Sequence, residues 1–222
     1  MLRGRFIQPA SSKIIKLLTP RTSSANFHDR QGEFDIFRVL SERGIKEGEE
    51  GKNAFKLFKL EQKFSISETQ LRKEMINLQQ QLHPDRYMGY GGGVQMKSEY
   101  LSSLVNEQYQ ILQEPYKRAK YLLSLVSNKD PNELERELDA LKMDPDFLTE
   151  MMDLQEKIGS RETRQEELAR IRHKLEVDIF CLNQELDLNF KERKVAKILP
   201  KLGKLKFLSK CLIAVDKRLD EY

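Results

Sequence analysis

The chain has 222 residues, of which 33% are charged and 39% hydrophobic, and it contains no tryptophan and only two cysteines. This length allows one or two domains with a modest core, and the abundance of helix-forming residues favours an all-α fold. No run approaches the ~20 apolar residues of a membrane-spanning helix, and two cysteines supply neither a disulfide framework nor a four-ligand zinc site. We therefore predict a chain with no metal, no cofactor and no membrane partner.

The net charge of +4 is concentrated at the N-terminus. Residues 1–28 contain five basic side chains and no acidic one, so the rest is nearly neutral and no nucleic-acid partner is expected. The same residues are rich in Ser and Thr, which predicts a mitochondrial transit peptide and a location in the mitochondrial matrix. A disordered basic tail is the alternative. Residues 29–52 mix charges with glycines, and we predict a poorly ordered leader there.

A capped amphipathic helix follows, and it leads into a proline turn. Ser67 and Gln70 have the spacing of a capping box, and the next apolar residues recur at the helical period: Leu71, Met75, Leu78 and Leu82. This helix must end at His83, because Pro84 disfavours the α conformation in the residue before it and has no N–H to donate. His83-Pro84-Asp85 is therefore predicted to form a rigid turn that presents an imidazole and a carboxylate at a helix end.

Two further helices and a domain boundary are expected before the C-terminal half. The Gly91-Gly92-Gly93 tract is predicted to be a flexible loop, since neither a preceding strand nor a following Gly-Lys-Ser/Thr supports a phosphate site. Helices are expected over roughly 97–114 and 116–126, separated by Pro115. Residues 128–144 are polar and contain Pro131, and we predict a linker between domains there.

The C-terminal residues 145–222 have the pattern of a three-helix bundle. Asp144-Pro145 starts the first helix, and segments 162–188 and 195–219 repeat apolar residues in steps of three and four. Pro200 is expected to kink or split the last segment. Leu148 and Met152 form a second apolar stripe on the first helix, and Phe207 lies beside the stripe of the last helix. These three side chains are left over once the bundle is packed.

Several motifs resemble, in order, those of the HscB-type J-proteins, co-chaperones of iron–sulfur cluster assembly that are mitochondrial in eukaryotes. The resemblance covers about residues 53–222 and rests on the segments Asn53–Phe58, Leu82–Arg86, Asn106–Tyr109, Arg118–Leu125, Asp146–Leu148 and Lys204–Leu208. It implies a J-domain over 53–127 and a scaffold-binding domain over 145–222.

The resemblance also implies two partners. One is a mitochondrial DnaK-type (70-kDa heat-shock) ATPase chaperone, whose hydrolysis the turn would stimulate through residues His83, Pro84, Asp85, Arg86, Arg72 and Lys73. The other is an IscU-type iron–sulfur cluster scaffold protein, which would bind residues Leu148, Met152, Phe207, Asp153 and Glu156. The chain departs from many J-domains in having glutamines at 79–81, where basic residues are common.

Three other functions are weighed against this one. His83 and Asp85 could act as an acid–base pair, but side chains two apart on a turn point in different directions and no nucleophile is placed nearby, so we predict no enzyme activity. A generic mitochondrial J-protein with other clients is the main alternative. A nucleic-acid binder is disfavoured by the near-neutral charge beyond residue 28.

Overall fold

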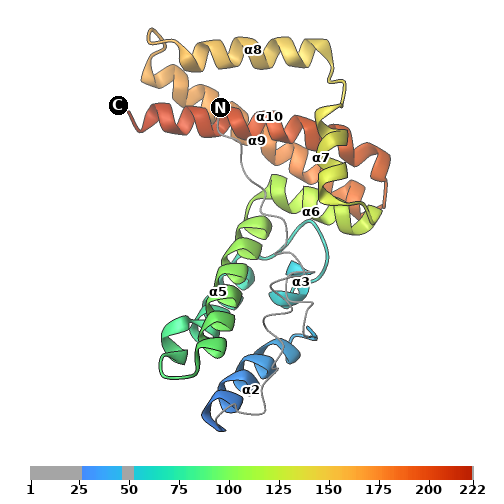
Figure 1. The fold of residues 1–222 in the computed structure, drawn as a ribbon. Helices are drawn as coiled ribbons and strands as arrows, with labels where there is room; N and C mark the ends of the chain where they lie inside the picture. The colour runs from blue at the N-terminus through green and yellow to red at the C-terminus, as the bar shows by residue number, and fades with distance from the viewer. Residues whose placement is uncertain (1–26, 47–52, 222) are drawn as a thin grey trace. The chain divides into compact units, whose positions relative to one another are not determined.

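The structure is a computed structural model that describes residues 27–46 and 53–221 (Figure 1). Within these ranges the chain is helical, and the extended pairing is limited to one isolated bridge between Met88 and Tyr90. The prediction of an all-α fold is confirmed. The chain divides into two compact units, which are described separately. The N-terminal unit contains residues up to Gln62 and Ile66–Gln113, and the C-terminal unit contains Lys63–Ser65 and Glu114–Tyr222.

The N-terminal unit is built around an antiparallel pair of helices, α4 (Glu68–Leu82) and α5 (Gly92–Gln113). The short α3 (Ala54–Leu57) packs against α5, and Phe58 meets Tyr109 edge to face at 6.3 Å between ring centroids. The Ser67 side chain caps α4 by accepting from Gln70 N–H at 3.2 Å. The Gln70 side chain donates to the Lys59 carbonyl at 3.1 Å instead of returning to Ser67, so only half of the expected capping box forms.

Residues 27–46, most of which were predicted to be a poorly ordered leader, are ordered in this unit. They contain α2 (Phe27–Ser41), which packs against α4 and α5. The prediction is wrong because Ile36, Val39 and Leu40 form an apolar stripe at helical spacing, and all three are buried. Residues 1–26, and with them nearly all of the predicted transit peptide, lie outside the described residues, as do residues 47–52.

The C-terminal unit is organised around a long antiparallel pair, α9 (Gln165–Lys191) and α10 (Val195–Leu219). Two helices, α6 (Pro115–Ser127) and α8 (Pro145–Gly159), pack against α10 (Figure 1). Pro200 does not split α10, which continues through it with Ile198 and Leu202 both fully buried. The core of α9 and α10 consists of the predicted leucine-rich stripes: Leu168, Leu175, Leu182, Leu186, Leu202, Leu205 and Leu208.

The division between the units differs from the predicted one. Residues 128–144 are not a plain linker, because they contain α7 (Pro131–Asp139), whose Leu134 and Leu138 are buried. The helix α6, assigned to the J-domain from sequence, belongs to the C-terminal unit because its apolar face packs against α10 and α7. An ion pair between Lys120 and Glu135, 2.5 Å apart, joins α6 to α7. The predicted three-helix bundle is therefore extended by two helices.

Two absences concern the described residues only. None of the helices in 27–46 and 53–221 has the length and apolarity that crossing a bilayer requires. The same ranges contain no cluster of three His, Cys, Asp or Glu side chains that could hold a metal ion.

Candidate functional site

The His83-Pro84-Asp85 turn lies at the exposed end of α4, as its sequence predicts. His83 leaves the helix in an extended conformation, and Pro84 starts a short 3-10 helix, η1 (Pro84–Tyr87). The side chains of His83 and Asp85 are 54% and 77% exposed. His83 Nδ1 accepts a hydrogen bond from Asp85 N–H at 3.3 Å. His83 Nδ1 also lies 3.5 Å from Asp85 Oδ2, so the two side chains are close together on the turn.

Three hydrogen bonds hold the turn by satisfying the last two carbonyls of α4 and the carbonyl of His83, which follows them. The Tyr87 hydroxyl donates to Gln81 O at 3.0 Å, the buried Ser98 hydroxyl donates to Leu82 O at 2.7 Å, and Arg86 N–H donates to His83 O at 3.1 Å. These carbonyls have no partner within the helix, so the bonds stabilise the helix end. Burial of Tyr87 raises the pKa of its hydroxyl, which keeps it protonated and able to donate. The turn is rigid although its functional side chains are exposed.

The helix α2 supports the residues that follow the turn. Tyr87 packs edge to face on Tyr90, with 5.6 Å between ring centroids. Gly32 of α2 lies so close to Tyr90 that an added Cβ would be 2.6 Å from its ring. The Asp29 carboxylate accepts a hydrogen bond from Gly91 N–H in the same loop. A chain of contacts thus runs from α2 through Tyr90 and Tyr87 to the end of α4.

The predicted basic residues lie on exposed positions of the same unit. Arg72 and Lys73 are exposed on the first half of α4, and Arg86 is exposed on η1. Ile76 is 50% exposed and lies one helical turn after Arg72 on α4. Gln79, one of the three glutamines, links α4 to α5: its amide donates to Ser102 O at 3.0 Å, and its carbonyl oxygen accepts from the Ser102 hydroxyl at 2.8 Å. A structural role thus accounts for one missing basic side chain.

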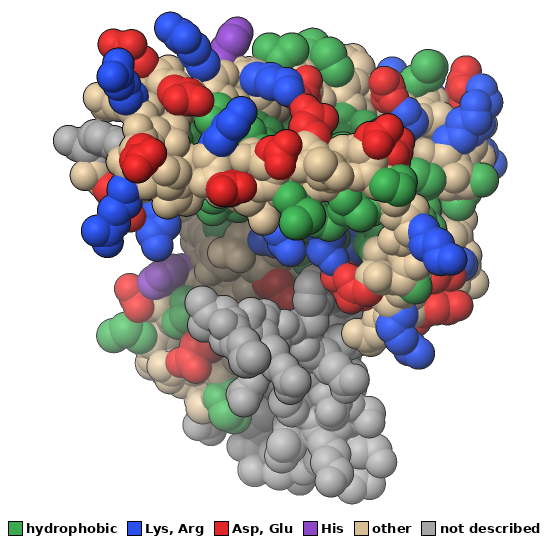
Figure 2. All heavy atoms as spheres, turned by 90° about the horizontal axis from the view of Figure 1, so that it is seen from above, with side chains coloured by type: hydrophobic (Ala, Val, Ile, Leu, Met, Phe, Trp, Pro, Cys, Tyr) green, Lys and Arg blue, Asp and Glu red, His purple; other side chains and the backbone are tan. Residues whose placement is uncertain are grey.

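Of the three left-over apolar residues, Leu148 and Met152 lie on α8 and Phe207 lies on α10. Met152 is 70% exposed, whereas Leu148 and Phe207 are half-buried. Phe207 of α10 meets Phe147 of α8 edge to face, with 6.1 Å between ring centroids and planes at 83°. We call Phe147, Leu148, Met152 and Phe207 the α8–α10 patch. Viewed from the α8 side, hydrophobic side chains of the C-terminal unit lie among charged ones (Figure 2).

Charged side chains flank the α8–α10 patch. Lys204 Nζ lies 5.2 Å from the centre of the Phe147 ring, which places a cation over one aromatic face. Asp153 and Glu156 are exposed on α8 and line a shallow hollow with Lys157 and Glu167. The patch therefore has charges of both signs beside it, and these can complement charged side chains on a partner.

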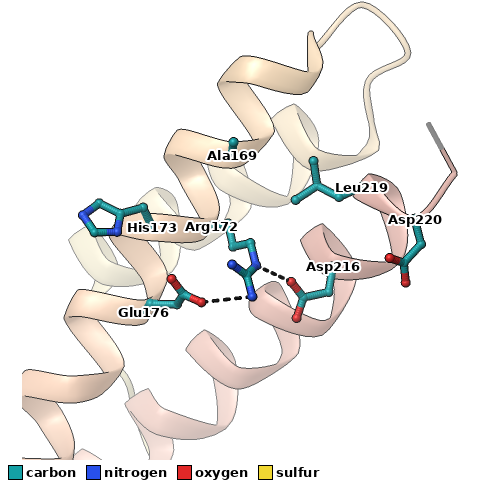
Figure 3. A pocket seen from close by; sticks show the side chains of 7 residues that line it. All are labelled: Ala169, Arg172, His173, Glu176, Asp216, Leu219 and Asp220. Carbon is teal, nitrogen blue, oxygen red and sulfur yellow. Dashed lines mark hydrogen bonds and ion pairs between the residues drawn. The ribbon is translucent and has the colours of Figure 1, made fainter.

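A second shallow pocket, between α9 and α10, has a structural explanation (Figure 3). Arg172 donates to Asp216 at 2.7 Å and pairs with Glu176 at 3.1 Å, so it joins the two helices. The hydrogen bond to Asp216 raises the pKa of Arg172, which stays charged. His173 is turned away from this group (Figure 3). Arg172, Asp216 and Glu176 thus satisfy one another, which gives these side chains a structural role.

Sequence reasoning placed the turn at the end of α4 but missed the residues that support it. Tyr87 lies two residues after Asp85 and is buried. An aromatic residue at this position in the sequence was a usable signal. Phe147, which lies beside Leu148 on α8, is half-buried and contacts Phe207. Nothing in the sequence alone indicated that Gly32 and Asp29 reach the loop after the turn.

The chain is similar in sequence and fold to known co-chaperones. Residues 143–216 match the family described as the HSCB C-terminal oligomerisation domain. A co-chaperone protein HscB homolog from Haemophilus ducreyi is 29% identical over 174 residues, which cover 75% of this chain and 95% of that protein. The co-chaperone protein HscB of Proteus mirabilis is 32% identical over 108 residues, covering 49% of this chain and 60% of the relative.

Two solved structures share the fold. The chaperone HscB from Vibrio cholerae superposes with a TM-score of 0.65 at 25% identity, covering 76% of this chain and 98% of that one. The human co-chaperone protein HscB superposes with a TM-score of 0.68 at 23% identity, covering 77% of this chain and 83% of that one. The relatives are named as co-chaperones and not as enzymes, in agreement with the prediction that this chain has no enzyme activity.

Proposed function

We propose that this chain, whose resemblance to HscB-type co-chaperones is confirmed by its C-terminal family match, its relatives and its fold, links two partners. Its C-terminal unit binds an IscU-type iron–sulfur cluster scaffold protein. Its His83-Pro84-Asp85 turn stimulates the ATPase of a DnaK-type chaperone, and cluster transfer is promoted. The single observation that carries the proposal is the turn itself, which is exposed at its side chains and rigid at its backbone.

The turn acts by binding and not by chemistry of its own. Asp85 offers an exposed carboxylate that can accept paired hydrogen bonds from an arginine of the chaperone. His83 and Pro84 set the direction of that carboxylate. The His83 imidazole accepts a hydrogen bond from Asp85 N–H, and Pro84 restricts the backbone. The ATPase accelerates when the turn binds one chaperone conformation better than the others. Arg72, Lys73 and Arg86 steer an acidic chaperone surface toward the turn.

The α8–α10 patch is the proposed scaffold site. Met152 offers the most exposed apolar side chain, and Leu148 lies one turn before it on the same face of α8. Phe207 extends the surface to α10 through its contact with Phe147. Asp153 and Glu156 add acidic partners at the margin. We place the protein in the mitochondrial matrix, on the basis of the basic, acid-free composition of residues 1–28.

The description of the matched family favours a second candidate for the C-terminal unit. Residues 143–216 match a domain described by oligomerisation, so we include self-association of this unit among its proposed functions. Self-association and scaffold binding are compatible if they use different faces.

The two proposed partners are tested by variants that should separate their effects. Asp85→Asn should abolish stimulation in a steady-state ATPase assay with the chaperone, yet leave the dissociation constant for the scaffold unchanged in calorimetry. Leu148→Asp with Phe207→Asp should do the reverse. Circular dichroism should show the helicity of wild type in both variants.

Two results would contradict the proposal. Unchanged ATPase stimulation by Asp85→Asn would exclude the turn as the stimulating element. Unchanged scaffold affinity in the double variant, or in the alanine variant of Leu148, Met152 and Phe207, would exclude the patch and favour a generic J-protein with other clients.

A further inference from the structure

The outer face of α9 carries apolar side chains that are exposed in the described part of the chain. Its inner face is buried against α10 through residues such as Leu175 and Leu182. Each residue turns a helix by 100°, so Val177 and Phe180 lie about half a turn away from those leucines. Phe180 is 63% exposed and Val177 46%, and both occupy the centre of a 27-residue helix. Isolated exposed apolar residues are ordinary, but this pair belongs to a longer pattern.

The pattern is a heptad stripe that is complementary to itself and exposed at every position except Asp187, whose side chain is 15% exposed. Alternating steps of four and three connect eight positions along α9, namely Glu166, Arg170, His173, Val177, Phe180, Gln184, Asp187 and Lys191. Such steps keep side chains on one line when two helices pair. The order of these steps is the same when the stripe is followed from its C-terminal end. An antiparallel copy therefore places each acidic position of the stripe opposite a basic one and the two central apolar positions opposite each other.

We propose that two copies of this chain pair through this outer face of α9, antiparallel, with the twofold axis between residues 178 and 179. Val177 of one copy then packs on Phe180 of the other, and Glu166 meets Lys191. Arg170 lies opposite Asp187, whose carboxylate already pairs with Lys191 at 2.6 Å and accepts from Ser65 N–H at 3.1 Å, so the exposed Glu166 and Lys191 supply most of the charge complementarity. This inference rests on the proposed self-association of the C-terminal unit and names its surface.

Charge fixes the direction of the pair. In a parallel arrangement Glu166 would face Glu166 and Lys191 would face Lys191, and like charges at close range oppose association. His173 is available to the outer face because it is turned away from Arg172 and the α10 side (Figure 3). The face is distinct from the α8–α10 patch, since α8 packs against α10.

The expected interface is small. Two helices of this length touch over about 40 Å, and only the centre of the stripe is apolar, which places the contact in the weak class of interfaces below about 1,200 Å². A monomer–dimer equilibrium that depends on concentration and on salt is therefore expected. It should weaken as salt rises, because its ends are held by exposed charges.

The test is sedimentation of the full chain as a function of concentration. Wild type should shift from monomer toward dimer as concentration rises, and Phe180→Glu should remain monomeric throughout. The matched control is Ile213→Glu, which changes a similarly exposed apolar residue on α10 and should dimerise like wild type. A wild type that stays monomeric, or a dimer that survives Phe180→Glu, overturns the inference.

A charge exchange tests the antiparallel geometry. Glu166→Lys alone and Lys191→Glu alone should each lose dimerisation, since each brings like charges together twice. An equimolar mixture of the two variants should recover it, because the lysine introduced in one variant then faces the glutamate introduced in the other. Absence of recovery, with wild-type helicity in both variants, overturns the antiparallel pair. Phe180→Glu should keep both ATPase stimulation and scaffold binding. Failure of the α9 pairing would therefore appear in sedimentation, whereas failure of the co-chaperone proposal would appear in the ATPase and scaffold-binding assays.

Discussion

A methyl group added at Gly32 should loosen α2 from the N-terminal unit. A Cβ at this position would lie 2.6 Å from Tyr90 Cδ1 and 2.8 Å from Val94 Cγ1, closer than these atoms can approach. Neither neighbour moves easily, because Val94 is buried and the Tyr90 ring packs on Tyr87. Overpacking of this kind costs about 1–3 kcal/mol, whereas replacing glycine by alanine in a helix gains about 1 kcal/mol. The cost of overpacking exceeds the gain in helix propensity, so Gly32→Ala should weaken docking of α2 by about 1 kcal/mol.

The matched control is Gly93→Ala. Gly93 also lies in a helix of the same unit, but an added Cβ there meets no atom within 4 Å. The propensity gain then acts alone, and this variant should be stabilised by up to about 1 kcal/mol. The two substitutions are chemically identical, so the opposite signs isolate the contact with Tyr90.

Native-state hydrogen exchange is the assay. Peptides from α2 and from residues 87–91 should exchange about fivefold faster in Gly32→Ala, since 1 kcal/mol changes an opening equilibrium by about that factor. Peptides from α9 serve as the internal reference and should not change. Equal or slower exchange of α2 in Gly32→Ala would refute the reasoning that α2 is closely packed on this loop.

Three further predictions concern charged and titratable groups. Arg43→Leu should destabilise the N-terminal unit by about 3 kcal/mol in urea unfolding, because it leaves Glu74 without the ion pair that joins them at 3.1 Å; the double variant with Glu74→Leu should recover most of the loss. Burial acts to raise the pKa of Glu135, but hydrogen bonds and charge from Lys120 and Lys206 lower it on balance. The C-terminal unit should therefore lose stability as pH falls through the carboxyl range. A thermal unfolding series over pH should show this loss, and a smaller loss in Lys206→Met. Burial raises the pKa of Tyr116 to about 12, so spectrophotometric titration should show one tyrosine ionising later than the rest, and Tyr116→Phe should remove that step.

Local physical rules explain what the sequence alone determined. Pro84 disfavours the α conformation at His83, so the turn at the end of α4 was predicted without any knowledge of the fold. The helical period marked the core leucines of α9 and α10 and left Leu148, Met152 and Phe207 over. Such rules act within one or two helical turns. The all-α fold and the turn at the end of α4 were therefore accessible from the residues themselves.

The tertiary structure decided which helices belong together. The apolar stripe of α2 is readable in the sequence, but only its docking on α4 and α5 shows that these residues form part of the N-terminal unit. The same holds for α6, which follows the J-domain motifs in sequence and packs with the C-terminal unit. Gln79 likewise joins α4 to α5 through its two hydrogen bonds to Ser102, a contact between residues far apart in sequence. Helix formation is decided by neighbours along the chain, whereas burial depends on a surface contributed by residues far away, and a single helix does not specify that surface.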